Sequence, residues 1–205
     1  MQKAKNTYLR RADREDLDKL VCWMEDEDFN YFLYGDPARS PSIIREQIVS
    51  YLGKSAGSVL PTGLYLLIDG PEGPIGMVSL QNISWRNRSC NIDVYISKPY
   101  RGQVTTGIGV FRALEYAFDE LNMHRVGAVI YAFNELSWKF FEFVGAVREV
   151  VLKDHILRDG KFYDVFVYGL LDREFNDWRD KHKKSIQEFE LRRMIESINR
   201  SESNL

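Results

Sequence analysis

Hydrophobic residues in the first quarter of the chain recur at the spacing of a helix face. A short strand over residues 7–10 is expected to lead into a helix that Asp13 can cap, because an aspartate side chain accepts hydrogen bonds from first-turn amides. The apolar positions of residues 17–24, and again those of residues 42–52, fall three or four apart. Each segment therefore predicts a helix with one buried face.

The pattern then changes to the spacing of strands. Residues 64–69 and 75–85 are rich in aliphatic side chains and are joined by the turn sequence GPEGP, which predicts a hairpin. Residues 90–97 alternate, with isoleucine and valine facing one way and asparagine, aspartate and tyrosine facing the other. This segment predicts a third strand with two different faces.

The second half of the domain mixes both spacings. An apolar stripe from Phe111 to Leu121 predicts a helix, and the apolar segment 125–133 predicts a strand buried on both faces. Residues 134–145 run from an asparagine to a glycine and predict a short helix. Residues 148–171 predict a hairpin that turns at an Arg-Asp-Gly triplet.

Residues 172–205 are strongly charged and carry a patchy helical stripe, so one or two helices are expected, with a frayed end. The tail could pack on its own domain. Alternatively, residues 174–199 could mediate homodimerisation or dock a partner, with the basic run at 181–184 touching an acidic surface.

Composition narrows the class of protein. Hydrophobic residues make up 44% of the 205 residues, which is enough for a core, and the net charge of −2 gives no electrostatic basis for binding nucleic acid. Cys22 and Cys90 lie in no Cys/His cluster, so reduced thiols and no metal are expected. The chain has no apolar run near the roughly 20 residues of a membrane span, and its polar start is unlike a secretory signal. A cytoplasmic protein is expected.

Four motifs in a fixed order carry a resemblance to a known family. They are YRGQ at 100–103, LEYAFDELNMHRV at 114–126, NELSWKFFEFVGA at 134–146 and DGKFYDVFVYGLL at 159–171. Together with the order of elements, they resemble the GNAT superfamily of acetyl-CoA-dependent N-acetyltransferases. The branch that includes ribosomal-protein N-terminal and spermidine acetyltransferases is the more similar one.

The resemblance implies a fold and a division of the chain. It implies an α/β (α+β) domain over residues 1–171, with a mixed, mostly antiparallel seven-stranded sheet flanked by helices. Residues 172–205 lie outside the likeness and form a charged helical C-terminal extension.

The resemblance also implies where acetyl-CoA would bind. The family's phosphate-binding turn falls on residues 101–106, with Val104 and Thr106 at positions that are usually small. The turn could keep its length, with the amides of residues 102–107 pointing inward at a helix N-terminus that suits a pyrophosphate. It could instead hold three extra residues, so that Gly107 and Gly109 form the cradle and the helix starts late, or these glycines could be only a loose helix start. The candidate residues are Arg101, Gly102, Gln103, Val104, Thr105, Thr106 and Gly107.

In this family the pantetheine arm lies between two splayed strands, here residues 90–97 and 125–131. Asn134 matches a family asparagine near the pantetheine, although it could equally be a helix N-cap. The candidate contacts are Tyr95, Ile96, Asn134 and Ser137.

A carboxylate can accept the proton that the substrate ammonium must lose. Asp93 is the candidate base, because its Asn-Ile-Asp context looks like that of aminoglycoside 6′-acetyltransferases; an exposed strand aspartate is the alternative. Glu135 is the second candidate for the base, and His155 could face the acceptor site. Phe141 stands where many members have a tyrosine that protonates the departing thiolate.

The acceptor pocket is expected between the first two helices and the last hairpin. Residues 25–36 are acidic and aromatic, which suits a cationic amine, although they could be a solvated helix end followed by core aromatics. The predicted activity is direct acetyl transfer, through a ternary complex, to a small amine such as a polyamine, amino sugar or aminoglycoside, or to a protein N-terminus. The alternative is a degenerate acyl-CoA-binding or interaction module.

Overall fold

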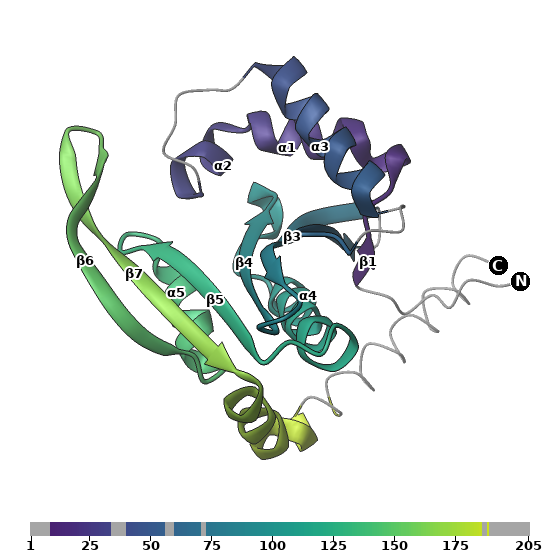
Figure 1. Ribbon diagram of the computed structural model, residues 1–205. Coiled ribbons are helices and arrows are strands. Elements are labelled where there is room, and N and C mark those ends of the chain that lie inside the picture. Colours follow the sequence, from purple (N-terminus) through teal and green to yellow (C-terminus); the bar gives the residue numbers. More distant parts are fainter. Residues whose placement is uncertain (1–8, 34–39, 56–59, 71–72, 186–187, 189–205) are drawn as a thin grey trace, which may run out of the picture.

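The computed structural model describes residues 9–33, 40–55, 60–70, 73–185 and 188. Seven strands form one sheet in the order β1-β2-β3-β4-β5-β7-β6, and only the β4–β5 pair in it is parallel (Figure 1). The strands are β1 (Leu9–Arg11), β2 (Leu64–Gly70), β3 (Gly73–Ser84), β4 (Ser89–Ile96), β5 (Arg125–Tyr131), β6 (Val147–Arg158) and β7 (Lys161–Leu171). The predicted fold class is confirmed.

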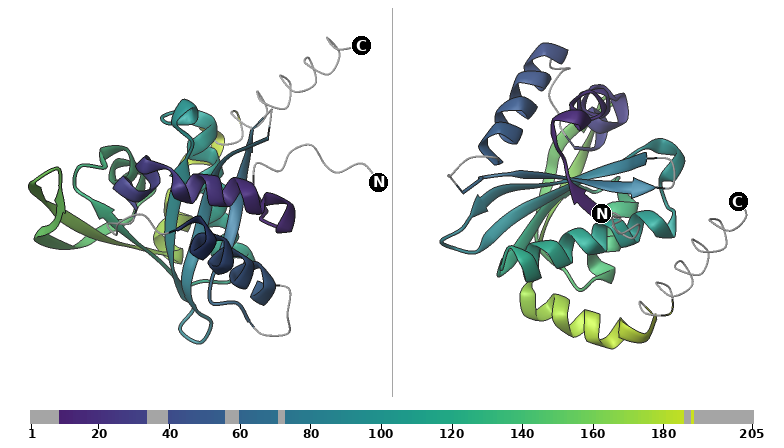
Figure 2. Two further views of the ribbon diagram at one scale, coloured as in Figure 1. Left: turned by 90° about the horizontal axis from the view of Figure 1, so that it is seen from above. Right: turned by 90° about the vertical axis from the view of Figure 1, so that its right-hand side faces the viewer.

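Helices cover both faces of this sheet (Figure 2). The α-helices are α1 (Leu17–Glu25), α2 (Glu27–Phe32), α3 (Pro41–Ser55), α4 (Val104–Glu115) and α5 (Glu135–Phe143), and a further helix covers residues 172–185. α4 continues into one turn of π-helix, Tyr116–Glu120. Within the described residues, no helix is both long and apolar enough to cross a membrane.

Each face of the sheet has its own hydrophobic core. Leu66 and Leu114 belong to the core between the sheet and α4 and α5, whereas Leu67 and Leu20 belong to the core between the sheet and α1 and α3. Successive residues of a strand point to opposite faces, so neighbours such as Leu66 and Leu67 enter different cores. The two faces predicted for residues 90–97 follow the same rule.

The hairpin β6–β7 turns as the sequence predicts. Asp159 and Gly160 have φ angles of 49° and 72°, so both central residues are in the left-handed region. A two-residue turn of this kind matches the twist of the flanking strands, and an Asp-Gly pair tolerates it. The hairpin is long and extends past the rest of the sheet (Figure 1).

Two local predictions need correction. Asp13 caps a single 3₁₀ turn, Arg14–Asp16, that leads into α1, and it does not cap α1 itself. The strand at 125–133 is not buried on both faces throughout, because Val129 is 53% exposed. The exposure arises where β5 leaves its partner β4, as described below. Residues 7–8 of the first predicted strand lie outside the described residues.

The first part of the C-terminal extension packs on the domain that precedes it. Phe175 is fully buried and stacks on Phe118 with ring centroids 5.1 Å apart, and Trp178 contacts Phe111 and Phe143. The apolar stripe of residues 172–185 is therefore occupied within this chain. Residues 186–187 and 189–199, which the docking hypothesis also included, lie outside the described residues.

Candidate active site

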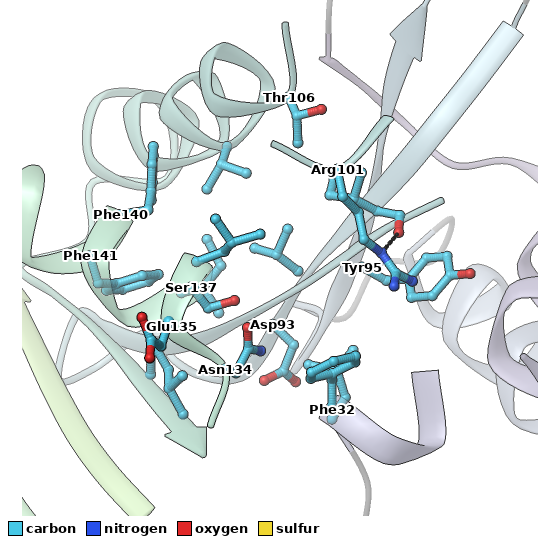
Figure 3. Close-up of a pocket in the computed structure, with 18 of the residues that line it drawn as sticks. Phe32, Asp93, Tyr95, Arg101, Thr106, Asn134, Glu135, Ser137, Phe140 and Phe141 are labelled. Carbon is cyan, nitrogen blue, oxygen red and sulfur yellow. Dashed lines mark hydrogen bonds between the residues drawn. The ribbon is translucent and has the colours of Figure 1, made fainter. Parts of the chain in front are cut away.

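A cavity of about 600 Å³ opens where β4 and β5 diverge. The parallel ladder joins Ser89–Asn91 to Arg125–Gly127, and beyond it the two strands form walls of the cavity. The first turn of α4 lies at one end, α2 lies at the other, and α5 completes the lining (Figure 3). Backbone groups beyond the end of a ladder can pair with an extended ligand as another strand would. The cavity is therefore a slot suited to a linear molecule.

The structure brings the predicted site residues together in this slot. Its lining includes Asp93, Tyr95, Ile96, Arg101, Gly102, Gln103, Thr106, Gly107, Asn134 and Ser137. The side chains of Val104 and Thr105 lie outside what the structure describes, although their backbone forms the first turn of α4.

α4 begins at Val104, with Gln103 at the N-cap position. Gly107 and Gly109 therefore lie inside the helix, and the alternative of a late helix start is wrong. A Cβ on Gly109 would lie 2.5 Å from Cγ2 of Ile68, so this glycine allows α4 to approach β2. Among the side chains that the structure describes, a Cβ on Gly107 would meet only Phe140, at 3.8 Å.

Internal hydrogen bonds brace the turn before α4. The hydroxyl of Thr106 donates to the carbonyl of Tyr100 at 2.8 Å, and the amides of Thr106 and Gly107 donate to the carbonyl of Gln103 at 3.1 and 3.4 Å. Gly102 has a φ of +72°, a conformation that glycine adopts without strain. The amide of Gln103 likewise donates to the carbonyl of Tyr100, at 3.4 Å, so three of the amides predicted to point inward, those of Gln103, Thr106 and Gly107, already have acceptors within the turn.

The guanidinium of Arg101 is directed toward α2. Its Nη1 donates to Oδ2 of Asp28 at 2.7 Å, and its Nε donates to the carbonyl oxygen of Ile96 at 2.9 Å. Figure 3 shows the guanidinium beside the Tyr95 ring at the edge of the slot.

Tyr95 lines the slot from β4. Its ring packs in the opposite core, with its centroid 5.8 Å from that of Trp23 and 5.5 Å from that of Phe29. Burial raises the pKa of Tyr95 to about 12, and the neighbouring Asp26 carboxylate adds to the shift. The phenol is therefore neutral near pH 7 and serves packing.

Asp93 lies on the cavity wall, on the face of β4 opposite Ile92 as expected. Its Oδ2 accepts a hydrogen bond from Nε2 of Gln81 at 2.9 Å, and Gln81 also donates to Oγ of Ser79 at 3.0 Å. These bonds fix the carboxylate in a part-buried position facing the slot (Figure 3). A fixed carboxylate beside a cavity can accept a proton from a bound amine.

α5 presents both polar and apolar groups to the cavity. Asn134 occupies the N-cap position, but its side chain makes no capping hydrogen bond and lies on the slot. Phe141 is buried and also lines the slot, so the position that could protonate a thiolate carries no hydroxyl. Glu135 and Ser137 complete this wall.

The predicted location of the acceptor pocket needs correction, because none of the described residues of α1, α3 or the last hairpin lines the cavity. The acidic and aromatic segment 25–36 does line it, through α2, a helix that the sequence did not predict. α2 places Phe32 on the lining, and the ring of Tyr31 packs against Phe133 with centroids 5.1 Å apart. The Tyr31 hydroxyl donates to Oδ2 of Asp159 at 3.0 Å, and Nε of Arg158 donates to the Tyr31 carbonyl at 3.3 Å. α2 is thus held against the tip of the last hairpin.

Part of the apolar lining was missed from the sequence. The missed residues are Val110, Phe133, Leu136 and Phe140, whereas Phe32, Leu33 and Val129 lie in segments that were predicted to border the site. In the sequence the missed residues follow the same periodicity as core residues, and only the partial exposure of residues such as Leu136 (66%) distinguishes them.

The histidines lie away from the slot. His155 is exposed on β6 and does not line the cavity. Nδ1 of His124 lies 3.2 Å from Oδ1 of Asp172, where it links the end of the α4 region to the C-terminal helix. The described residues hold no group of three His, Cys, Asp or Glu side chains that could bind a metal ion.

Comparisons with known proteins agree with this geometry. The family described as "Acetyltransferase (GNAT) domain" matches residues 6–147. The putative ribosomal N-acetyltransferase YdaF of Bacillus subtilis is 27% identical over 82% of this chain and 90% of its own length. The crystal structure of Vibrio cholerae spermidine N-acetyltransferase with CoA and spermine has a TM-score of 0.71 at 21% identity, and covers 82% of this chain and 96% of that one. A dodecameric structure of the same enzyme has a TM-score of 0.68 at 21% identity, and covers 82% of this chain and 94% of that one. At these identities the two structures establish the fold.

Proposed function

The chain belongs to the acetyltransferase (GNAT) family, and from this premise we propose that it transfers an acetyl group from acetyl-CoA directly to a primary amine. The observation that carries the proposal is the separation of β4 and β5 beyond their three-residue ladder, at the N-terminus of α4. The separated strands offer a slot for the pantetheine, and the helix start offers amides and a partial positive charge for the pyrophosphate.

In the proposed complex the acyl-CoA runs from the α4 turn along the slot. Backbone groups of Tyr95 and Ile96 pair with the pantetheine, with Asn134 and Ser137 on the opposite wall. This arrangement places the thioester between the strands, next to Asp93. Holding both reactants in one cavity supplies the orientation that direct transfer requires.

Asp93 acts as the general base in this proposal. It takes a proton from the bound ammonium, directly or through one water molecule, so that the nitrogen lone pair can attack the thioester carbonyl. The tetrahedral intermediate then collapses and expels the CoA thiolate. Phe141 cannot protonate that thiolate, but a thiol pKa of about 8.5 makes it a good leaving group without assistance.

The acceptor is proposed to be a cationic amine. Asp93 and the rings of Phe32 and Phe133 face the acceptor end, and aromatic rings and carboxylates both attract an ammonium group. Small amines and protein N-termini both meet this description. Two similar proteins are named as a spermidine N-acetyltransferase and a putative ribosomal N-acetyltransferase, and both names are compatible with this proposal.

The test combines binding and turnover. Calorimetry with acetyl-CoA should give a saturable site in the parent and in Asp93→Asn. Acetylation should then be screened with spermidine, an aminoglycoside and a peptide with a free N-terminus, and Asp93→Asn should lose at least roughly a hundredfold in kcat. Glu135→Gln is the matched comparison on the opposite wall and should keep turnover.

The outcomes separate the candidates. Absence of acetyl-CoA binding by the parent would refute the proposal. Acetyl-CoA binding without turnover on any amine would favour the degenerate acyl-CoA-binding module. Loss of turnover in Glu135→Gln with activity retained in Asp93→Asn would move the base to α5.

We also propose that the chain forms a homo-oligomer. The outer edge of β6 exposes Val147, Val150 and Val151, and an uncovered apolar edge strand favours pairing with another chain. The dodecameric state of the Vibrio cholerae enzyme is compatible with self-association in this fold.

A further inference from the structure

Arg101 joins three parts of the site through one guanidinium group. Arg101 belongs to the turn before α4, its Nε bonds the last residue of β4, Ile96, and its Nη1 bonds Asp28 in α2. Asp28 and Arg101 are 73 positions apart in the sequence, so their contact is made by the tertiary fold.

The pair is partly shielded from solvent. The side chains of Arg101 and Asp28 are 27% and 32% exposed, and the rings of Phe32 and Tyr95 lie 5.8 and 5.9 Å from the guanidinium carbon. A charge-assisted hydrogen bond in such surroundings is stronger than an exposed ion pair, because water and salt screen it less.

α2 needs external contacts to hold its place. It has six residues, which is far below the length at which a helix is stable alone. Phe29 anchors it in the core, Tyr31 ties its end to the hairpin, and Asp28 ties it to Arg101. Because α2 carries Phe32 into the cavity lining, its position decides the shape of the acceptor end.

We propose that Arg101 is a positioning residue for the acceptor wall, and not a ligand of the CoA phosphates. Through Asp28 it fixes α2, and through Ile96 it fixes the end of β4, so the wall that receives the amine is tied to the turn that begins α4. The effect of Arg101 on catalysis rests on the proposed function. The anchoring of α2 does not, and it can be measured without substrate.

Two other roles for these residues predict different changes in acetyl-CoA affinity and in the KM for the amine. If Arg101 bound the pyrophosphate, Arg101→Gln would weaken acetyl-CoA binding. If Asp28 bound the amine directly, Arg101→Gln would free that carboxylate and lower the KM for the amine. A positioning role leaves acetyl-CoA affinity unchanged and raises the amine KM in both Arg101→Gln and Asp28→Asn.

Hydrogen exchange of the full chain measures the anchoring directly. Amides of residues 27–33 should exchange roughly threefold to tenfold faster in Asp28→Asn and in Arg101→Gln, because local opening then breaks one fewer charge-assisted bond.

Asp28→Glu should keep the parent rate, since it retains a carboxylate. Asp18→Asn, which breaks an exposed pair with Arg45 away from the cavity, is the matched control and should also leave these amides unchanged. Equal exchange in parent, Asp28→Asn and Arg101→Gln would overturn the proposal.

Binding and kinetics complete the test. With the amine that the parent acetylates in the screen above, both single variants should raise KM by a similar factor. The double variant should add nothing further, because the two residues act as one unit. A tenfold loss of acetyl-CoA affinity in Arg101→Gln, or a fall in its amine KM, would overturn the assignment.

Failure of the two proposals can be told apart. A parent chain that does not bind acetyl-CoA refutes the acetyltransferase function, while hydrogen exchange still decides whether Arg101 and Asp28 hold α2. A parent that binds and acetylates, with α2 exchange unchanged in the variants, refutes only the positioning role.

Discussion

Gly107 and Gly109 lie two positions apart in α4 and have different surroundings. Gly109 faces the buried side chain of Ile68, and a Cβ on Gly109 would lie within 2.9 Å of three carbon atoms of that side chain. A Cβ on Gly107 would make one ordinary contact with the described side chains, to Phe140. A residue that looks like half of a phosphate-binding motif is therefore a close-packing residue. A side chain added at Gly109 would therefore disturb the packing of α4 against β2.

We expect Gly109→Ala and Gly107→Ala to differ in stability by roughly 1–3 kcal/mol, the usual range for overpacking a core. Both changes gain about 1 kcal/mol of helix propensity, so that gain cancels in the comparison. Urea unfolding of the two variants measures the difference. Equal free energies of unfolding would mean that Ile68 moves aside at no cost.

At the scale of elements, the C-terminal helix completes the core beneath α4. Phe175 is fully buried between Phe111 and Phe118, and Arg179 pairs with Asp119 at 2.5 Å. The helix thus closes one face of the domain, which gives the charged extension a structural role in residues 172–185. The boundary at residue 171 stays a prediction.

Phe175→Ala should lower the free energy of unfolding by about 3–5 kcal/mol, as for other large-to-small changes of buried aromatic residues. Phe143→Ala is the control, because Phe143 contacts the same helix but is 60% exposed and should cost much less. Denaturant unfolding followed by tryptophan fluorescence reports both. A small effect of Phe175→Ala would mean that the helix detaches readily.

At the scale of the whole molecule, the two edges of the sheet differ. Within the described residues, β1 ends one edge with three residues, whereas β6 ends the other with twelve, several of them exposed and apolar. A short edge strand has few unpaired backbone groups with which another chain could pair, whereas a long apolar edge strand has many. Self-association is therefore expected at β6.

Light scattering after gel filtration should detect an oligomer in the parent. Val151→Lys should shift it toward the monomer, because a lysine on the edge strand opposes pairing by charge and desolvation. Leu60→Lys changes another exposed apolar residue, 63% accessible and outside the sheet, and should leave the oligomer intact. A monomeric parent, or equal behaviour of the two variants, would contradict the expectation.

Local patterns in the sequence were sufficient for the order of the strands, the two faces of β4 and the Asp-Gly turn of the last hairpin, but they did not predict the short helix α2 between the first two predicted helices. Each of the correct predictions depends on residues close together in the chain: side-chain alternation, helical spacing, or a pair of residues that tolerates positive φ. The neighbourhood of Asp93, Asn134 and the turn at 101–107 also followed, because the resemblance fixed which strands and helices meet.

The tertiary structure decided what depends on distant contacts. It set the start of α4 at Val104, which places Gly109 inside the helix, where it packs on Ile68. It directed Arg101 to Asp28, and it ended the β4–β5 ladder after three residues, which exposes Val129 to the slot. The partners of an ion pair and the number of residues over which two strands pair depend on how distant segments pack together. The spacing of residues along the chain does not determine that packing.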